Sequence, residues 1–205
     1  RDKYLQKEYM KAGVDTVICQ HFTIDINTFC GKMQMWADGK KLTPGVDFAM
    51  REYSPGVKGE FPVYHVDTLN YNAEKMFADL AKPEYANCLV CVEFWFAYRH
   101  RGDFSKLQKA GQCTNAGLIQ TFSSPIKFFK AYGDRVIDKP IIWTTPEAIE
   151  GVKRVRVNVE NEFLKGYDLF NVIAKVEGEN QDSCYLFTAH YDHLGNLGRK
   201  VFYGG

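Results

Sequence analysis

The chain has no apolar run long enough to cross a membrane, and it carries almost no net charge. The longest apolar stretch, residues 88–98, is interrupted by Glu93, whereas a transmembrane helix needs about 18 or more apolar residues in a row. The 26 basic side chains are balanced by 25 acidic ones. This balance leaves no basic surface for nucleic acid and no polybasic segment for a membrane. The sequence therefore predicts neither a membrane span nor a nucleic-acid partner.

Glycine-rich phosphate-binding loops are also absent, since neither G-x-G-x-x-G nor a Walker-type sequence occurs. The sequence contains no internal repeat and no low-complexity segment. Of its 205 residues, 45% are hydrophobic and 25% are charged, which is an ordinary globular composition and excludes wholesale disorder. This length is enough for one large domain or two small ones.

Cysteines are too few for the fold to depend on disulfides, because only six occur in the chain. Cys88 and Cys91 have C-x-x-C spacing, but no second C-x-x-C completes a zinc ribbon. They also lie in an apolar, strand-like run, where residues three apart point to opposite faces. We therefore interpret both as ordinary buried cysteines.

The first part of the chain is rich in strand patterns. Residues 2–12 carry apolar side chains near helical spacing and are followed by Gly13, which predicts a short helix. The β-rich segments that follow are separated by turns containing glycine or proline. The strands predicted here cover residues 16–26, 33–37, 47–53 and 61–66.

From about residue 71 the patterns of strands and helices alternate, which is typical of α/β structure. Within the apolar strand predicted at 87–98, we expect Trp95 and Phe96 in the core and Glu93 facing outward. The predicted helices cover residues 73–81, 104–110, 124–132 and 146–149, and the predicted strands cover 87–98, 116–122, 140–144, 153–159, 171–176 and 183–190.

The densest group of ionisable residues follows the last predicted strand and consists of His190, Asp192 and His193. Because residues two apart on a strand share a face, His190 and Asp192 can meet. A carboxylate beside an imidazole fixes its tautomer and raises its basicity, as around zinc-bound histidines. The pattern alone also fits a structural histidine. A second H-x-D pair, His65 and Asp67, is interpreted as an exposed pair at a strand end.

One metal-binding pattern can be excluded. Metallo-β-lactamases carry H-x-H-x-D-H, but Thr188 stands where the first histidine is needed. No histidine follows His193 to supply the downstream ligands.

The sequence around His190 resembles the start of the catalytic domain in zinc aminopeptidases of metallopeptidase family twenty-eight, the bacterial leucyl aminopeptidase and glutamate carboxypeptidase group. The resemblance runs over residues 154–205. It rests on N-V-I-A at 171–174 and on H-Y-D-H-L-G at 190–195. It implies that His190 is the first zinc ligand and that Asp192 supports it. It also implies two zinc ions bridged by a carboxylate and a water, with a glutamate that takes the proton of the water.

In that family the bridging aspartate follows a Gly-Gly pair such as Gly204-Gly205, where the sequence stops. The resemblance therefore implies that this aspartate, the glutamate base and the other ligands lie beyond Gly205. A catalytic zinc needs about three protein ligands. We accordingly expect an N-terminal fragment that is inactive alone, does not bind zinc tightly, and depends on the remainder of the catalytic domain and a peptide substrate.

The middle of the chain resembles a protease-associated domain, which is commonly inserted ahead of the peptidase core and is thought to cover the cleft or bind peptides. Two positions depart from the pattern of such domains. Asn115 interrupts the pattern, and Lys139 stands before Pro140 where an apolar residue is usual. Residues 38–47 resemble N-terminal segments of secreted bacterial members, so we expect a secreted or periplasmic protein whose signal peptide has been removed. The resemblance to a protease-associated domain is carried by residues 87–92, 107–111, 116–119, 139–143 and 147–150.

The sequence thus predicts an α/β (α+β overall) fold. It comprises an N-terminal helix and β segment at 1–45 that packs on the peptidase core, a β-rich protease-associated-like domain at 46–152, and the first strands of an α/β zinc-exopeptidase domain at 153–205. The predicted parent is a zinc-dependent aminopeptidase. The alternative is a non-catalytic, protease-associated-like binding module in which His190 is structural.

Overall fold

The computed structural model describes residues 2–122, 126, 132–180, 182–192, 195–199 and 201–203. The fold is mixed α/β, as the sequence predicted. The chain divides into two compact units, and each is assembled from segments that are distant in the sequence. The first unit comprises Arg1–Ile26 and Leu164–Asp192, and the second comprises Asn27–Phe163 and His193–Gly205.

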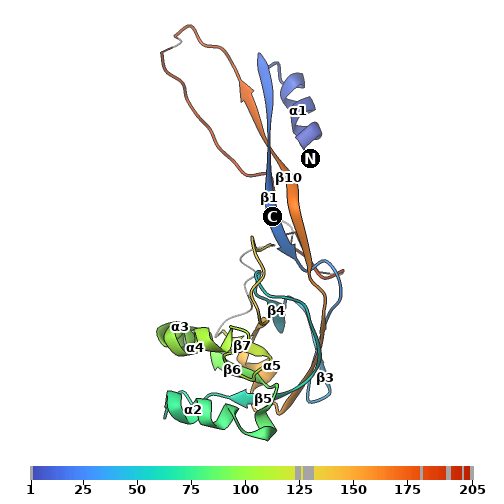
Figure 1. Ribbon diagram of the computed structural model, residues 1–205. Helices are drawn as coiled ribbons and strands as arrows, with labels where there is room; N and C mark the ends of the chain where they lie inside the picture. Colours follow the sequence, from blue (N-terminus) through green and yellow to red (C-terminus); the bar gives the residue numbers. More distant parts are fainter. Residues whose placement is uncertain are drawn as a thin grey trace. The chain divides into compact units, whose positions relative to one another are not determined.

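The first unit is built on two long strands that pair with each other (Figure 1). They run antiparallel, because Asp15 donates its backbone N–H to the carbonyl of Lys175 while Gly166 donates to the carboxylate of Asp25. A helix lies beside this ribbon. These elements are α1 (Asp2–Lys11), β1 (Thr16–Thr28) and β10 (Glu162–Lys175).

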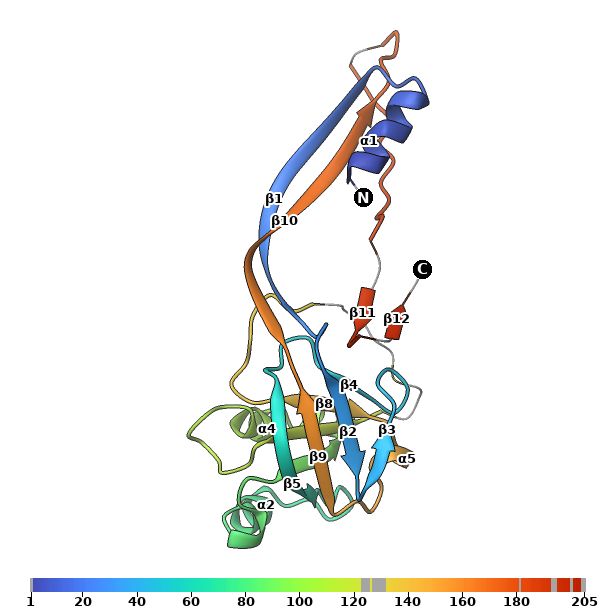
Figure 2. The ribbon, with the colours of Figure 1, turned by 90° about the vertical axis from the view of Figure 1, so that its right-hand side faces the viewer.

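The second unit contains an eight-stranded sheet in the order β3-β2-β9-β5-β6-β7-β8-β4 (Figure 2). Strands β3, β2, β9 and β5 pair antiparallel, whereas β5 to β8 pair parallel, and β4 adds an antiparallel edge. The strands are β2 (Met33–Ala37), β3 (Lys40–Leu42), β4 (Phe48–Met50), β5 (Val57–His65), β6 (Leu89–Glu93), β7 (Gly117–Thr121), β8 (Ile141–Thr144) and β9 (Arg154–Val159).

Short helices and one further hairpin complete the second unit. Helix α2 begins where the Asn72 side chain accepts the backbone N–H of Lys75, at 2.9 Å. No helix among the described residues is long and apolar enough to span a membrane. The remaining elements are α2 (Ala73–Leu80), a 3₁₀ turn (Pro83–Tyr85), α3 (Phe94–Arg99), α4 (Arg101–Leu107), α5 (Pro146–Ile149), β11 (Gly195–Leu197) and β12 (Val201–Tyr203).

Strand β6 is buried on both faces and separates two apolar cores. Leu89 and Cys91 belong to the core that also contains residues of β2, β5 and β9, whereas Cys88 and Val90 belong to the core that contains residues of α2 and α4. The two cysteines are 0% and 5% exposed. The prediction that they are buried cysteines on opposite faces is therefore confirmed.

The strand predicted at residues 87–98 is wrong in its second half, because α3 begins at Phe94. The Glu93 carboxylate accepts the backbone N–H groups of Trp95 and Phe96, at 2.8 and 2.5 Å, and so caps the new helix. Glu93 is thus both the last residue of β6, where it is partly buried, and the cap of α3. Trp95 was expected in the core but is 57% exposed.

The strand predicted at residues 183–190 is also wrong, because none is formed between residues 182 and 192. The aromatic side chains of Tyr185 and Phe187 are 95% and 91% exposed. A β-rich sequence needs a paired neighbour to supply its backbone hydrogen bonds, and no described strand pairs with this segment.

The other predicted elements in the described part of the chain are present with small shifts in their ends. The predicted strand at 171–176 is the end of β10, which begins earlier at Glu162. The strand predicted at 47–53 shortens to β4. The helix predicted at 124–132 lies outside the described residues, apart from residues 126 and 132.

Candidate functional site

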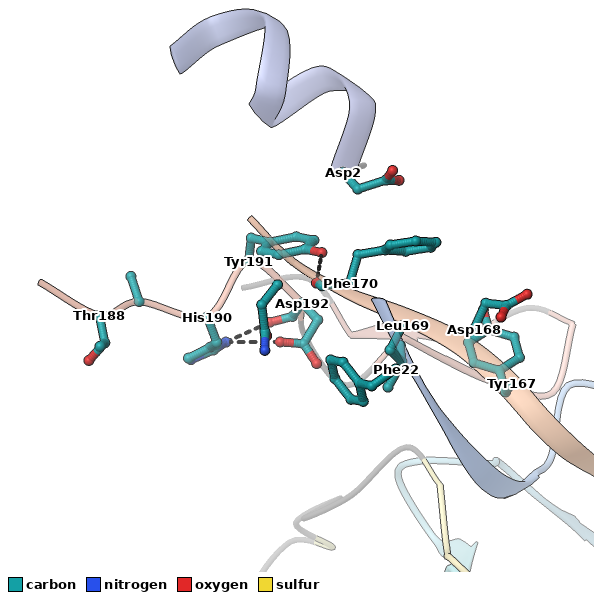
Figure 3. A pocket seen from close by; sticks show the side chains of 12 residues that line it. Asp2, Phe22, Tyr167, Asp168, Leu169, Phe170, Thr188, His190, Tyr191 and Asp192 are labelled. Atoms are coloured by element: carbon teal, nitrogen blue, oxygen red, sulfur yellow. Dashed lines mark hydrogen bonds and ion pairs between the residues drawn. The ribbon is translucent and has the colours of Figure 1, made fainter. Parts of the chain in front are cut away.

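The predicted site residues line a hollow of about 940 Å³ in the first unit (Figure 3). The ribbon of β1 and β10 forms one side, and the extended segment at residues 188–192 forms another. The start of α1 contributes Asp2. The lining side chains labelled in Figure 3 are Asp2, Phe22, Tyr167, Asp168, Leu169, Phe170, Thr188, His190, Tyr191 and Asp192.

His190 and Asp192 meet, as their spacing predicted. Nδ1 of His190 lies 2.7 Å from the carbonyl oxygen of Asp192 and 3.5 Å from its carboxylate. Since both are acceptors, Nδ1 carries the proton and Nε2 is the nitrogen left with a lone pair. The two side chains are 79% and 72% exposed, so water screens their attraction.

Tyr191 holds this segment against the ribbon. Its hydroxyl donates to the backbone carbonyl of Phe170, on β10, at 2.6 Å. Figure 3 shows the Tyr191 ring turned toward Phe170 while His190 turns toward Asp192. No local pattern in the sequence indicates this role of Tyr191, because its partner Phe170 is 21 residues away.

A second histidine–carboxylate pair stands on the ribbon itself. Nε2 of His21, on β1, lies 2.6 Å from the carboxylate of Asp168, on β10, and the His21 ring lies 5.1 Å from that of Phe170. Asp168 also lines the hollow. This pair could not be predicted from the sequence, because its members are 147 residues apart and no local spacing pattern signals such a contact.

The described residues do not by themselves fit a complete zinc centre. Among them, no group of three or more histidine, cysteine, aspartate or glutamate side chains is placed to hold a metal ion. His190 offers one nitrogen, whereas a catalytic zinc takes about three protein ligands. His193, the other histidine of the motif, lies outside the described residues.

The second H-x-D pair behaves as the sequence predicted. His65 is the last residue of β5 and Asp67 follows it, and both are exposed. Nε2 of His65 donates to the carbonyl of Val152, at 2.8 Å. Asp67 instead accepts hydrogen bonds from Asn70, which hold the pKa of its carboxyl below the usual range. The two H-x-D pairs therefore differ: His190 and Asp192 contact each other, whereas His65 and Asp67 each bind a different residue.

Comparison with known proteins finds similarity in structure but not in sequence. No protein-family profile matches the chain, and no curated protein sequence is detectably similar. An aminopeptidase from Aneurinibacillus sp. strain AM-1 shares the fold over 88% of the chain, with a TM-score of 0.50 and 17% identity. A peptidase M28 precursor from Shewanella amazonensis SB2B aligns over 84% of the chain, with a TM-score of 0.48 and 12% identity.

The chain spans less than half the length of both structures, 43% of the first and 45% of the second. The fold is similar to that of the Aneurinibacillus aminopeptidase, and the predicted resemblance to this type of peptidase is confirmed at the level of the fold.

Proposed function

We propose that this chain is the N-terminal part of a secreted two-zinc aminopeptidase that removes residues from the N-termini of peptides. The observation that carries the proposal is the contact between His190 and Asp192 in a chain with an aminopeptidase-like fold. The peptidase relationship rests on the fold, and the aminopeptidase chemistry rests on the H-Y-D-H-L-G motif and its geometry.

In this proposal His190 binds zinc through Nε2, and Asp192 keeps the proton on Nδ1. An orienting partner of this kind is the usual support of a zinc-bound imidazole. The bound metals would polarise the scissile carbonyl and lower the pKa of a bound water. The bridging carboxylate, the general base and the other ligands are proposed to lie beyond Gly205, together with the rest of the catalytic domain.

The exposed segment that precedes His190 supports the same proposal. Tyr185, Leu186 and Phe187 are 95%, 81% and 91% exposed, and large apolar side chains in a row on a surface mark a site that another segment covers. We propose that the remainder of the catalytic domain pairs with residues 183–190 and covers these side chains. Residues 46–152 are proposed to act as the protease-associated-like domain.

Aminopeptidase activity is tested on the whole gene product. Purified protein loaded with zinc should cleave at least one member of an aminoacyl-nitroanilide panel. Treatment with a chelator should abolish this activity and added zinc should restore it. If the zinc-loaded whole protein cleaves no member of the panel, the proposal fails.

The fragment proposal makes a separate prediction for the 205-residue chain. Because only one ligand of the proposed site is present, calorimetric titration with zinc should reveal no tight site. Tight binding of two zinc ions per chain would contradict the assignment of the remaining ligands to residues beyond Gly205.

The second candidate is a non-catalytic, protease-associated-like binding module. It is favoured by the two apolar cores of the second unit and by the high exposure of His190 and Asp192. The codons that follow Gly205 separate the candidates. A continuation of the Ala-Asp-Asp type supports the peptidase, whereas a stop codon supports the binding module.

A further inference from the structure

A second hollow, of about 630 Å³, lies in the second unit and is separate from the one that contains His190. It is formed by the β2–β3 hairpin and by the hairpin of β11 and β12. Its size is within the range of sites that bind small molecules. The residues that matter for its chemistry are Lys32, Met33, Lys41, Leu42, Leu197 and Arg199.

The floor of the hollow is apolar. Most of the surface that lines the hollow is apolar. Met33, Leu42 and Leu197 lie beneath this surface, are 8%, 1% and 0% exposed, and are held in place by their packing against the core. An apolar floor of this kind favours a ligand with a hydrocarbon body, because burial of apolar surface is the main source of affinity there.

Gly198 allows the β11–β12 hairpin to approach the floor closely. Its backbone N–H donates to the carbonyl of Phe29, at 2.7 Å, and its φ is +66°, a conformation that favours glycine. A Cβ at this position would lie 3.0 Å from the Cβ of Met33. The close approach seats Leu197 in the floor and brings Arg199 to the rim.

The rim carries more positive than negative charge. Lys32 is paired with Glu160, with 2.9 Å between Nζ and the carboxylate, and this hydrogen bond lowers the pKa of Glu160. Lys41 and Arg199 also line the rim and form no ion pair with another described residue, although the charge of Arg199 helps to lower the pKa of Glu160. Three cations therefore line the hollow, and one carboxylate, Glu160, lies beside Lys32.

We propose that this hollow binds a small amphiphilic carboxylate, with its hydrocarbon body on the floor and its carboxylate between Lys41 and Arg199. The guanidinium of Arg199 can pair with both carboxylate oxygens, and Lys41 adds a second positive charge. A neutral ligand would leave these charges unused, and an amphiphilic cation would be repelled by them. The inference does not depend on the proposed peptidase activity.

Calorimetric titration of the 205-residue chain with decanoate tests the proposal, with decylammonium as the probe of opposite charge. Decanoate should bind with one site per chain, and decylammonium should bind at least about tenfold more weakly. Hexanoate should bind more weakly than decanoate, by up to about fourfold for each methylene group removed. All titrations stay below the concentrations at which the probes form micelles.

Two neighbouring lysines on β3 provide a matched pair of variants. Lys41 lines the hollow, whereas Lys40 is exposed and does not line it. Lys41→Glu should weaken decanoate binding about tenfold, and Lys40→Glu should leave it unchanged within about twofold. Thermal melting of both variants verifies that they fold equally well.

The carboxylate could belong to a fatty acid or to the C-terminus of an apolar peptide. N-acetyl-trileucine and its amide form distinguish these sources. Binding of the peptide acid but not of its amide assigns the site to peptide C-termini, and binding of decanoate alone assigns it to fatty acids. The proposal is overturned if neither carboxylate binds, if decylammonium binds as tightly as decanoate, or if both lysine variants bind decanoate equally.

Discussion

At His190, the contact with Asp192 determines which nitrogen of the imidazole ring carries the proton and which keeps its lone pair. The carbonyl and carboxylate of Asp192 both face Nδ1, so Nε2 is left to bind a metal or a proton. The H-x-D spacing allows such a contact between residues two apart but does not determine it, because the same spacing leaves His65 and Asp67 with separate partners. The contact of His21 with Asp168 could not be predicted in this way, since it depends on the pairing of β1 with β10.

Cysteine reactivity gives the first prediction at this scale. Burial raises the pKa of the Cys91 thiol to about 12 and that of Cys88 to the same value. At pH 8, iodoacetamide should therefore modify the exposed Cys30 and Cys184 but spare Cys88 and Cys91 until the protein is unfolded. Mass spectrometry of the peptides measures this order. Modification of Cys91 as fast as Cys184 in folded protein would contradict the burial of β6.

The raised pKa values of these buried thiols also make the free energy of unfolding depend on pH. A thiol whose pKa is raised by folding binds its proton more tightly in the folded state. Its contribution is therefore complete below the ordinary value of 9.0 and is lost as the pH rises through about 12. Cys91→Ala should weaken this alkaline loss of stability.

A buried amide gives the second prediction. Asn27 is 0% exposed. Its amide donates to the carbonyls of Glu52 and Ser54, at 2.9 and 2.8 Å, and its oxygen accepts from Asn161, at 2.6 Å. Asn27→Ala leaves these buried groups without partners and should lower the free energy of unfolding by about 2–3 kcal/mol.

Urea denaturation measures this loss. The control is Asn158→Ala, because the amide of Asn158 is only partly buried and makes one side-chain hydrogen bond among the described residues, to Gln34. It should change the free energy of unfolding by less than about 1 kcal/mol. Equal losses in the two variants would show that the Asn27 contacts do not hold this part of the second unit together.

At the scale of elements, apolar periodicity predicted where most strands and helices lie but not where α3 begins. The run at residues 88–98 is apolar enough for one long strand, and composition alone cannot separate that from a strand followed by a helix. The change depends on one side chain, since the Glu93 carboxylate satisfies two backbone N–H groups at the start of α3. A capping residue inside an apolar run does not change the apolar periodicity, so the start of the helix cannot be predicted from that periodicity.

The capping role of Glu93 gives the third prediction. Glu93→Ala should lower the free energy of unfolding by about 1 kcal/mol, because the N–H groups of Trp95 and Phe96 lose their acceptor. Glu84→Ala, on the exposed 3₁₀ turn, is the matched control and should have a much smaller effect. If both variants unfold at the same urea concentration as the original chain, the cap does not stabilise α3.

The segment at residues 183–190 marks the other limit of prediction at this scale. Its sequence favours a strand, but a strand forms only where a neighbour is available for pairing. In the described part of the chain the segment remains unpaired and its aromatic residues are exposed. The peptidase proposal gives these residues a partner in the remainder of the catalytic domain.

At the scale of the whole molecule, the α/β class and the resemblance to an aminopeptidase were predictable, and the direct pairing of β1 with β10 was not. The class follows from the alternation of strands and helices after residue 71. The first unit instead joins residues 1–26 with residues 164–192, and such a long-range pairing leaves no trace in local periodicity. Asp2 and Phe22 therefore line the candidate hollow although both lie far from His190 in the sequence.

The measurement that tests the central claim most directly compares two histidines of H-x-D pairs in the whole gene product. His190→Ala and His65→Ala variants are purified in parallel, and their zinc content and aminopeptidase activity are measured together. The account predicts that His190→Ala loses bound zinc and at least about a hundredfold in activity, whereas His65→Ala retains both within about twofold. If His190→Ala retains the zinc content and activity of the original protein, His190 is not a zinc ligand and the central claim is wrong.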